Sequence, residues 1–111
     1  MSYSKIEDAL LAVLPKRVYK VQAPLDDEDG APILRYIVWT PTGERYWYAD
    51  SKPFVRIYQA VVTVATQAED DPLPSQVVQA LADAHIAMQT AEHSYDAETA
   101  TYYADIPCEV I

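Results

Sequence analysis

The chain has 111 residues, of which 50% are hydrophobic. This length and composition predict a single domain, residues 1–111, with a hydrophobic core of its own. Seventeen acidic and eight basic residues give a formal net charge of −9. This balance argues against a nucleic-acid partner, which needs clustered lysine and arginine, and against an anionic membrane surface. A basic protein surface would be attracted, although such a charge also simply keeps a protein soluble.

The cysteine content and the N-terminal segment bear on the compartment. Cys108 is the one cysteine of the chain, so no disulfide can form within it, which fits a reducing cytoplasm. The stretch MSYSKIEDALLAVLP has no basic segment and no long apolar core, and we expect no signal peptide. No window approaches the roughly 20 apolar residues of a membrane span. We therefore expect an intracellular protein with no membrane partner.

The first elements in chain order are a helix and a loop. Residues 4–14 predict a short helix with Ser4 as N-cap, an apolar stripe on one face and Pro15 at its end. A short extended segment, 18–22, follows. Residues 23–32 hold two prolines, a glycine and four consecutive acids, which predict a loop. Its spacing does not match a calcium-binding loop. The four acids are Asp26, Asp27, Glu28 and Asp29.

The middle of the chain is rich in strand-forming residues. Residues 33–40 and 45–49 predict two strands, with Pro41 and Gly43 in the turn of a hairpin between them. Asp50 to Pro53 predict a second turn or a bulge. Residues 54–66 are the longest β-like run and contain no glycine or proline, so we expect them to form the central strand.

The last part of the chain predicts a helix and closing strands. Residues 75–90 predict a helix with Ser75 as N-cap. Residues 91–96 and about 100–110 then predict short and long closing strands, with Pro107 at an edge or a bulge. The order of elements predicts an α+β fold, a mostly antiparallel β-sheet flanked by two α-helices. The apolar face of the second helix would comprise Val77, Val78, Leu81, Ala84, His85 and Met88.

The sequence shows no catalytic signature. Two histidines, His85 and His93, and scattered acids lack the spacing of metal ligands. Cys108 has no neighbouring motif of a nucleophile, so we expect a small buried apolar residue there. With two glycines in the chain, a glycine-rich phosphate loop is excluded. We expect no enzyme activity, no cofactor and no metal.

Nine tyrosines and two tryptophans are the unusual feature of the composition. Tyr46, Trp47 and Tyr48 are consecutive, and neighbours in a strand point to opposite faces, so we expect one face outside the helix-covered core. The open alternatives are ordinary half-exposed sheet aromatics and an interface with another subunit. Alternation does not decide which of the two faces is inward.

The layout of elements resembles a known family. The segments that carry the resemblance are IEDALLAVL, YIVWT, YWYADSKPF, VRIYQAVVTVATQAEDD, VVQALADAHI and YDAETATYYADIPCEV. They are similar to the small head–tail connector and tail-terminator, or tail-completion, proteins of long-tailed bacteriophages and prophages. The best-matching features are the turn at 49–53 that leads into the long strand, the acids at 69–71 and the late strand at 98–103.

The resemblance implies a structural virion protein without catalytic residues. It would assemble with itself as a ring, commonly a hexamer, at the head–tail junction, and contact neighbouring head–tail or tail-tube proteins. Its location would be the host cytoplasm during assembly and then the virion. We expect the three consecutive aromatics and the four-acid loop to be interface residues. The alternative is a small acidic intracellular protein-binding module, similar to an immunity protein or an antitoxin, that covers a basic partner.

Overall fold

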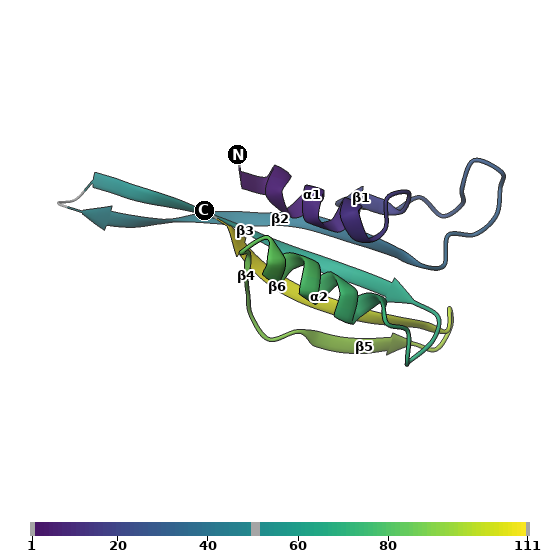
Figure 1. Ribbon diagram of the computed structural model, residues 1–111. Coiled ribbons are helices and arrows are strands. Elements are labelled where there is room, and N and C mark those ends of the chain that lie inside the picture. Colours follow the sequence, from purple (N-terminus) through teal and green to yellow (C-terminus); the bar gives the residue numbers. More distant parts are fainter. Residues whose placement is uncertain (1, 50–51, 111) are drawn as a thin grey trace.

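The computed structural model describes residues 2–49 and 52–110, in which two helices and six strands are present (Figure 1). In chain order they are α1 (Ser2–Val13), β1 (Val18–Lys20), β2 (Tyr36–Ala49), β3 (Lys52–Thr66), α2 (Leu73–Asp83), β4 (Ala87–Met88), β5 (Glu92–Asp96) and β6 (Thr101–Val110). The strands form one sheet in the order β1-β2-β3-β6, with β4 and β5 paired one after the other along β6. β1 and β2 are parallel, and the other pairs are antiparallel. The α+β prediction is confirmed.

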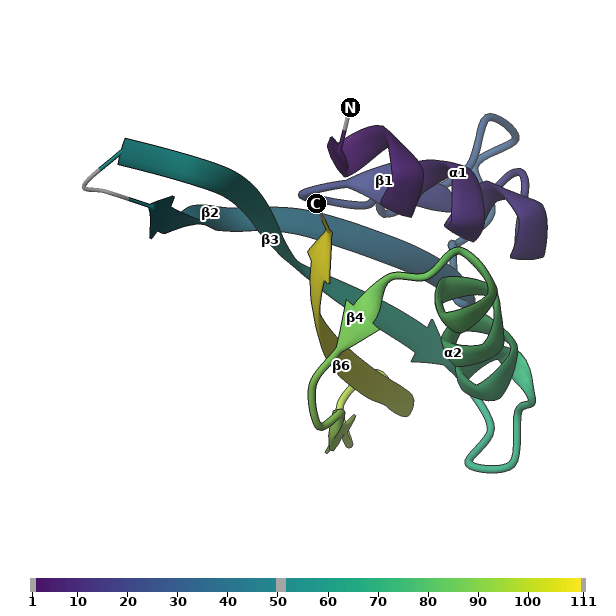
Figure 2. The same cartoon turned by 60° about the vertical axis from the view of Figure 1, so that its left-hand side comes forward.

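The core lies between the sheet and the two helices, which pack side by side on one face of it (Figure 2). Alternate residues of each strand point into this layer because side chains in a strand alternate between faces. Burial of each such aliphatic side chain contributes about 1.5–3 kcal/mol to folding. The fully buried aliphatic residues include Ile6 and Leu10 of α1, Val77 and Leu81 of α2, and Ile37, Val62, Val64 and Ile106 of the sheet.

β3 is the central strand, as predicted. Residues 58–66 pair with β6 on one side and with β2 on the other. Val62, for example, lies between Trp39 and Ile106, and its side chain is 0% exposed. The strand begins at Lys52, two residues before the predicted start at 54.

The predicted hairpin turn at Pro41 and Gly43 is wrong, since β2 runs without interruption through both residues. Instead of a turn, the pairing with β3 shifts register between Pro41 and Gly43, which marks a β-bulge. Pro41 is tolerated because the described pairing with β1 ends at Trp39, which leaves that stretch of β2 at an edge. β2 ends at Ala49 and β3 begins at Lys52, so Lys52 and Pro53, which we expected in the second turn or bulge, belong to the strand. The other two residues of that prediction, 50 and 51, lie outside the described residues.

The second helix ends earlier than predicted, at Asp83. His85 adopts a left-handed conformation, φ 60°, and its amide donates to the Ala82 carbonyl while the amide of Ile86 donates to Leu81. This pair of bonds is the Schellman motif, and histidine is among the few residues that enter the left-handed region readily. His85 is therefore exposed rather than on the inner helix face. Val78 is also exposed, and Met88 belongs to β4.

Both predicted N-caps lie inside their helices. α1 begins at Ser2, before Ser4, and α2 begins at Leu73, before Ser75. The amide of Leu73 donates instead to Oδ1 of Asp71 at 2.8 Å, so an acid upstream of the helix satisfies one of its free donors. In the described part of the chain, no helix is long and apolar enough to span a bilayer.

Candidate functional site

A two-stranded arm extends from the sheet beyond the strands that enclose its base (Figure 1). Among the described residues, β1 pairs with β2 no further than Trp39, and β6 pairs with β3 no further than Tyr58. Residues 45–49 and 52–57, which we call the arm, therefore pair with each other alone. The arm makes the molecule long, 54 × 27 × 24 Å, with a radius of gyration of 15.3 Å. A compact domain of this size would have about 13 Å.

The three aromatic residues predicted at an interface lie on the arm. The exposed fractions of Tyr46, Trp47 and Tyr48 are 37%, 55% and 64%. The rings of Tyr46 and Tyr48 are 6.5 Å apart on one face of the ribbon, which leaves Trp47 on the other. The expectation that one of these faces would be inward is wrong. At these three residues the ribbon runs past β1 and β6, so side chains on both of its faces reach solvent, although Ile57 nearer the base is buried.

A polar cluster organises the tyrosine face of the arm. The Tyr46 hydroxyl donates to a carboxylate oxygen of Glu44 at 2.8 Å, and this hydrogen bond raises the pKa of Tyr46. Arg56 donates to the Tyr58 hydroxyl at 3.0 Å and lies 3.8 Å from the same Glu44 carboxylate. Its guanidinium is 5.8 Å from the Tyr46 ring and 5.7 Å from the Tyr58 ring, within range of cation–π attraction. This face thus presents aromatic rings and a cation together.

The base of the arm is attached to the body at the β-bulge. The Tyr3 hydroxyl of α1 lies 2.8 Å from the Gly43 carbonyl oxygen and 3.1 Å from that of Gln59. Burial is the largest of the causes that raise the pKa of Tyr3. On the β6 side, Arg45 donates to Glu109 at 2.7 Å. These contacts fix the direction in which the arm leaves the sheet.

The four-acid loop forms a small turn at the end of the molecule opposite the arm (Figure 1). Oδ1 of Asp27 accepts hydrogen bonds from the amides of Asp29 and Ala31, both at 2.9 Å. Its second oxygen lies 3.6 Å from Arg17. Asp26, Glu28 and Asp29 are exposed. Within one chain, the structure therefore does not bring this loop together with the aromatic arm.

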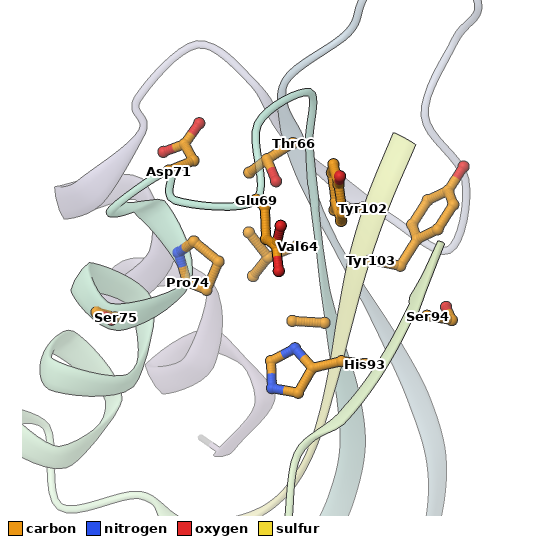
Figure 3. A pocket seen from close by; sticks show the side chains of 11 residues that line it. Val64, Thr66, Glu69, Asp71, Pro74, Ser75, His93, Ser94, Tyr102 and Tyr103 are labelled. Carbon is orange, nitrogen blue, oxygen red and sulfur yellow. The ribbon is translucent and has the colours of Figure 1, made fainter. Parts of the chain in front are cut away.

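Sequence reasoning missed a groove between α2 and β5 (Figure 3). Two adjoining cavities of about 340 and 280 Å³ share Pro74, Ser75, His93 and Ala104 in their linings, and we call their union the α2–β5 groove. Val64, Ala104 and Ile106 supply an apolar floor, while Glu69 and Asp71 stand at one end. The lining comes from four separate segments, so no local pattern indicates it. The acids at 69–71, which form part of the family resemblance, supply two of its lining residues.

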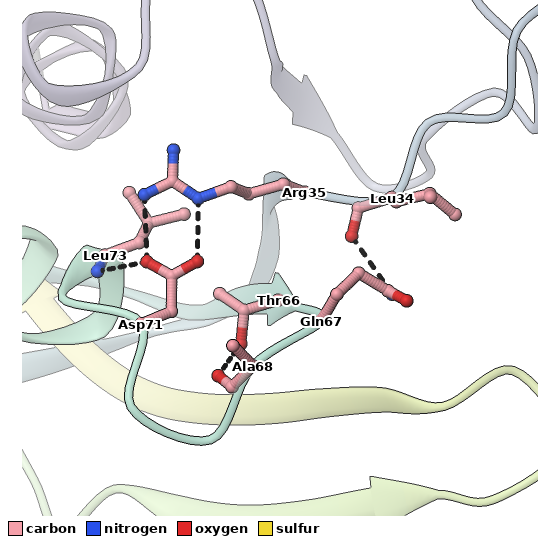
Figure 4. Close-up of polar contacts among 7 residues, drawn as sticks. All are labelled: Leu34, Arg35, Thr66, Gln67, Ala68, Asp71 and Leu73. Atoms are coloured by element: carbon pink, nitrogen blue, oxygen red, sulfur yellow. Dashed lines mark hydrogen bonds and ion pairs between the residues drawn. The ribbon is translucent and has the colours of Figure 1, made fainter.

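The acidic end of the groove is fixed by one bidentate ion pair (Figure 4). Arg35 donates to both carboxylate oxygens of Asp71, at 2.8 and 2.9 Å. The hydrogen bonds from Arg35 are the largest cause of a lowered pKa of Asp71, and the pKa of Arg35 is raised in turn. Asp71 thereby ties the start of α2 to the segment that leads into β2. Glu69 stays exposed at the mouth of the groove.

The residues considered for chemistry are dispersed. His85 and His93 are both exposed, and the described residues contain no group of three or more side chains placed to hold a metal. Cys108 is buried, as predicted, and burial raises its thiol pKa to about 12. Since the thiolate is the reactive form, this cysteine is unsuited to nucleophilic chemistry at neutral pH.

Comparison with known proteins identifies a similar fold. No protein-family model and no curated protein matches the sequence. Among solved structures, the chain is similar to a chain of the "Virion of native gene transfer agent (GTA) particle". The TM-score is 0.61 at 13% sequence identity, and the similarity covers 97% of this chain and 88% of that chain. The likeness at this identity establishes a shared fold over nearly the whole chain.

Proposed function

We propose that this protein is a structural protein of a phage-type virion that assembles as a ring at the head–tail junction, as a tail terminator, tail-completion or head–tail joining protein. The observation that carries the proposal is the fold match over 97% of the chain to a chain of a virion structure. It agrees with the family resemblance of the sequence, which rests on different evidence. Its partners would be further copies of itself and neighbouring head–tail or tail-tube proteins, in the host cytoplasm during assembly and then in the virion.

The arm supports a role in assembly. Exposed aromatic residues are enriched in protein interfaces because they bury a large area at small cost in conformational entropy. Tyr46, Trp47 and Tyr48 place three such residues on a ribbon that contributes little to the protein's own core. A ring of copies gives such a ribbon a neighbour to contact. The dispersed histidines and the buried cysteine are consistent with a non-enzymatic role.

The test is deletion of the gene in cells that produce the particles. We expect electron microscopy of the lysate to show separate heads and tails, and a plasmid copy of the gene to restore complete particles. The protein should also be found by mass spectrometry in purified complete particles. Complete, infective or transducing particles from the deletion strain would overturn the proposal.

The second candidate is an acidic module that covers a basic partner protein. The observation that favours it is the exposed acidic loop, with Asp26, Glu28 and Asp29 in solvent on a chain of net charge −9. This second candidate function gives the aromatic arm no role. Intact particles from the deletion strain, together with a stable one-to-one complex with a basic protein, would favour this second function over the first.

A further inference from the structure

The α2–β5 groove combines an apolar floor with negative charge at one end. Among the described residues that line it, none is lysine or arginine, while Glu69 and Asp71 both reach it. Asp70 adds a third carboxylate to this short loop, and Arg35 neutralises one of the three. The volumes of the two cavities are close to the lower end of the range for sites that take up small ligands, about 300–1,000 Å³. One aromatic side chain is the kind of group that such a space accepts.

The tyrosine face of the arm has the complementary character. Tyr46 lies next to Tyr48 and beside Arg56, whose side chain is 54% exposed. Residues 45–57 contain three basic and one acidic residue, a net charge of +2. Since the whole chain has a net charge of −9, the remaining residues together carry −11. The arm is therefore the positive, aromatic part of an otherwise acidic molecule.

The edges of the arm favour docking through side chains over strand addition. Tyr48 pairs with Pro53, which has no amide hydrogen, and the register shifts between Trp47 and Tyr48. Prolines and bulges are devices that blunt a strand edge against pairing with another chain. The Tyr46 and Tyr48 side chains are the groups left to carry a contact.

We propose that the arm of one copy docks into the α2–β5 groove of another copy, with Tyr48 on the apolar floor and Arg56 facing Glu69. The arm extends from one end of the molecule, whereas α2 and β5, which border the groove, lie beside the other half of the sheet (Figure 1). The contact is therefore one between copies. A contact between two different surfaces of identical copies is heterologous, and repeated heterologous contacts close into rings when the rotation permits. The inference rests on the proposed ring and supplies its subunit contact.

The electrostatics of the contact are consistent with the arm's own ion pairs. Arg56 lies 3.8 Å from Glu44, yet a guanidinium has five donors and can accept a second carboxylate. Glu69 has an exposed side chain in a loop of three acids and gains a cation. Trp47 lies on the other face of the ribbon, where it lines a cavity with Lys5 and Ile57 of its own chain. It therefore serves as the matched control for Tyr48.

The experiment is photo-crosslinking of the purified full chain with benzoylphenylalanine in place of Tyr48, which keeps an aromatic group there. Mixing of isotope-labelled and unlabelled protein distinguishes crosslinks between copies from those within a chain. We expect intermolecular crosslinks to residues 74–79 and 91–94. The same photoreactive residue in place of Trp47 should give far fewer. Crosslinks mainly from arm to arm, crosslinks to other segments, or none at the highest soluble concentration would overturn the inference.

Charge reversal provides the second readout. Glu69→Lys or Arg56→Glu should each reduce the intermolecular crosslink about two- to fivefold, the range for one exposed ion pair, and the double variant should restore it. Asp8→Lys makes the same charge change on the exposed side of α1 and should have no effect. Equal losses from Asp8→Lys, or no rescue in the double variant, would contradict the assigned pair. Particle assembly is measured separately in the deletion strain. If the crosslinks form as expected but the deletion strain still makes complete particles, the proposed function is refuted while the arm–groove contact stands.

Discussion

β3 passes through two different environments, and their comparison shows what holds this fold together. Residues 58–66 lie between β2 and β6 under the helices, and Ala60, Val62 and Val64 are at most 1% exposed. Residues 52–57 pair with β2 alone. A two-stranded ribbon by itself is marginally stable in water, so the arm depends on the body while the body does not depend on the arm.

The difference teaches that similar strand-forming sequence serves two purposes. In the body, a β-branched residue is buried and contributes to stability. In the arm, Tyr46 and Tyr48 contribute little to the core and are available to a partner. Substitutions should therefore divide into those that unfold the body and those that leave it intact while disturbing assembly.

The largest effect is expected for Val62→Asp in the body. Val62 is 0% exposed at the centre of the sheet, and a carboxylate there would be buried without a partner. We expect a loss of about 3–5 kcal/mol in the free energy of unfolding, measured by urea denaturation. The matched control is Val61→Asp on the half-buried opposite face of the same strand, which should cost clearly less. Equal stability of the Val62→Asp variant and the wild type would refute the central position of β3.

The next effect concerns the ion pair that ties α2 to the sheet. Asp71→Ala removes the bidentate contact with Arg35 and the hydrogen bond from the Leu73 amide, and should cost about 1–2 kcal/mol at pH 7. The folded-state pKa of Asp71 is lowered, so its contribution is complete above the usual value of about 3.9 and is lost as the pH falls through the lower folded value.

The melting-temperature difference between wild type and the Asp71→Ala variant should therefore be constant near neutral pH and shrink below about pH 4. Asp70→Ala, an exposed neighbour in the same loop, is the control and should leave the melting temperature nearly unchanged. A difference that grew on acidification would contradict the direction of the pKa shift.

A smaller effect is expected where the arm joins the body. Tyr3→Phe keeps the ring contacts with Trp39 and Tyr58 but removes the hydroxyl that lies beside the Gly43 and Gln59 carbonyls. We expect a loss of about 0.5–1 kcal/mol, with faster amide exchange in the arm and unchanged exchange in residues 60–66. Uniformly faster exchange across β3 would mean that arm and body unfold as one unit.

The sequence was informative wherever local pattern decides structure. The apolar stripe of α1, the run that forms β3 and the alternation of β6 each predicted an element within two or three residues of its observed bounds. Pro41 and Gly43 led to the wrong prediction of a hairpin turn, because proline and glycine are typical both of turns and of bulges at the edge of a sheet. The end of α2 was missed because His85, and not glycine, takes the left-handed position of the C-terminal motif.

The site was less accessible to sequence reasoning for a different reason. That Tyr46, Trp47 and Tyr48 form part of an interface remains a prediction, as it does for the four acids at 26–29. The exposure of the three aromatic residues depends on where β1 and β6 stop pairing, which is a property of the assembled sheet. The α2–β5 groove likewise exists only once four separate segments are in place.

The smallest effect on the isolated protein is expected for the aromatic residues of the arm, and it gives the sharpest test of the comparison. Tyr48 is 64% exposed, so Tyr48→Ala should change the free energy of unfolding by no more than about 0.5 kcal/mol. Trp47→Ala, at 55% exposure, should also stay far below the about 3–5 kcal/mol expected for a tryptophan in the core.

The two variants should separate in assembly. Aromatic residues at the centre of an interface carry much of its binding free energy, so Tyr48→Ala should reduce the yield of complete particles in a complementation assay while its purified protein melts normally. Trp47 lies on the opposite face of the arm, where it lines a cavity with other residues of the same chain. Trp47→Ala should therefore reduce the yield of complete particles less than Tyr48→Ala does. If both variants melt normally and both restore full particle yield, the arm is ordinary exposed sheet, and its aromatic residues do not contribute to a subunit contact.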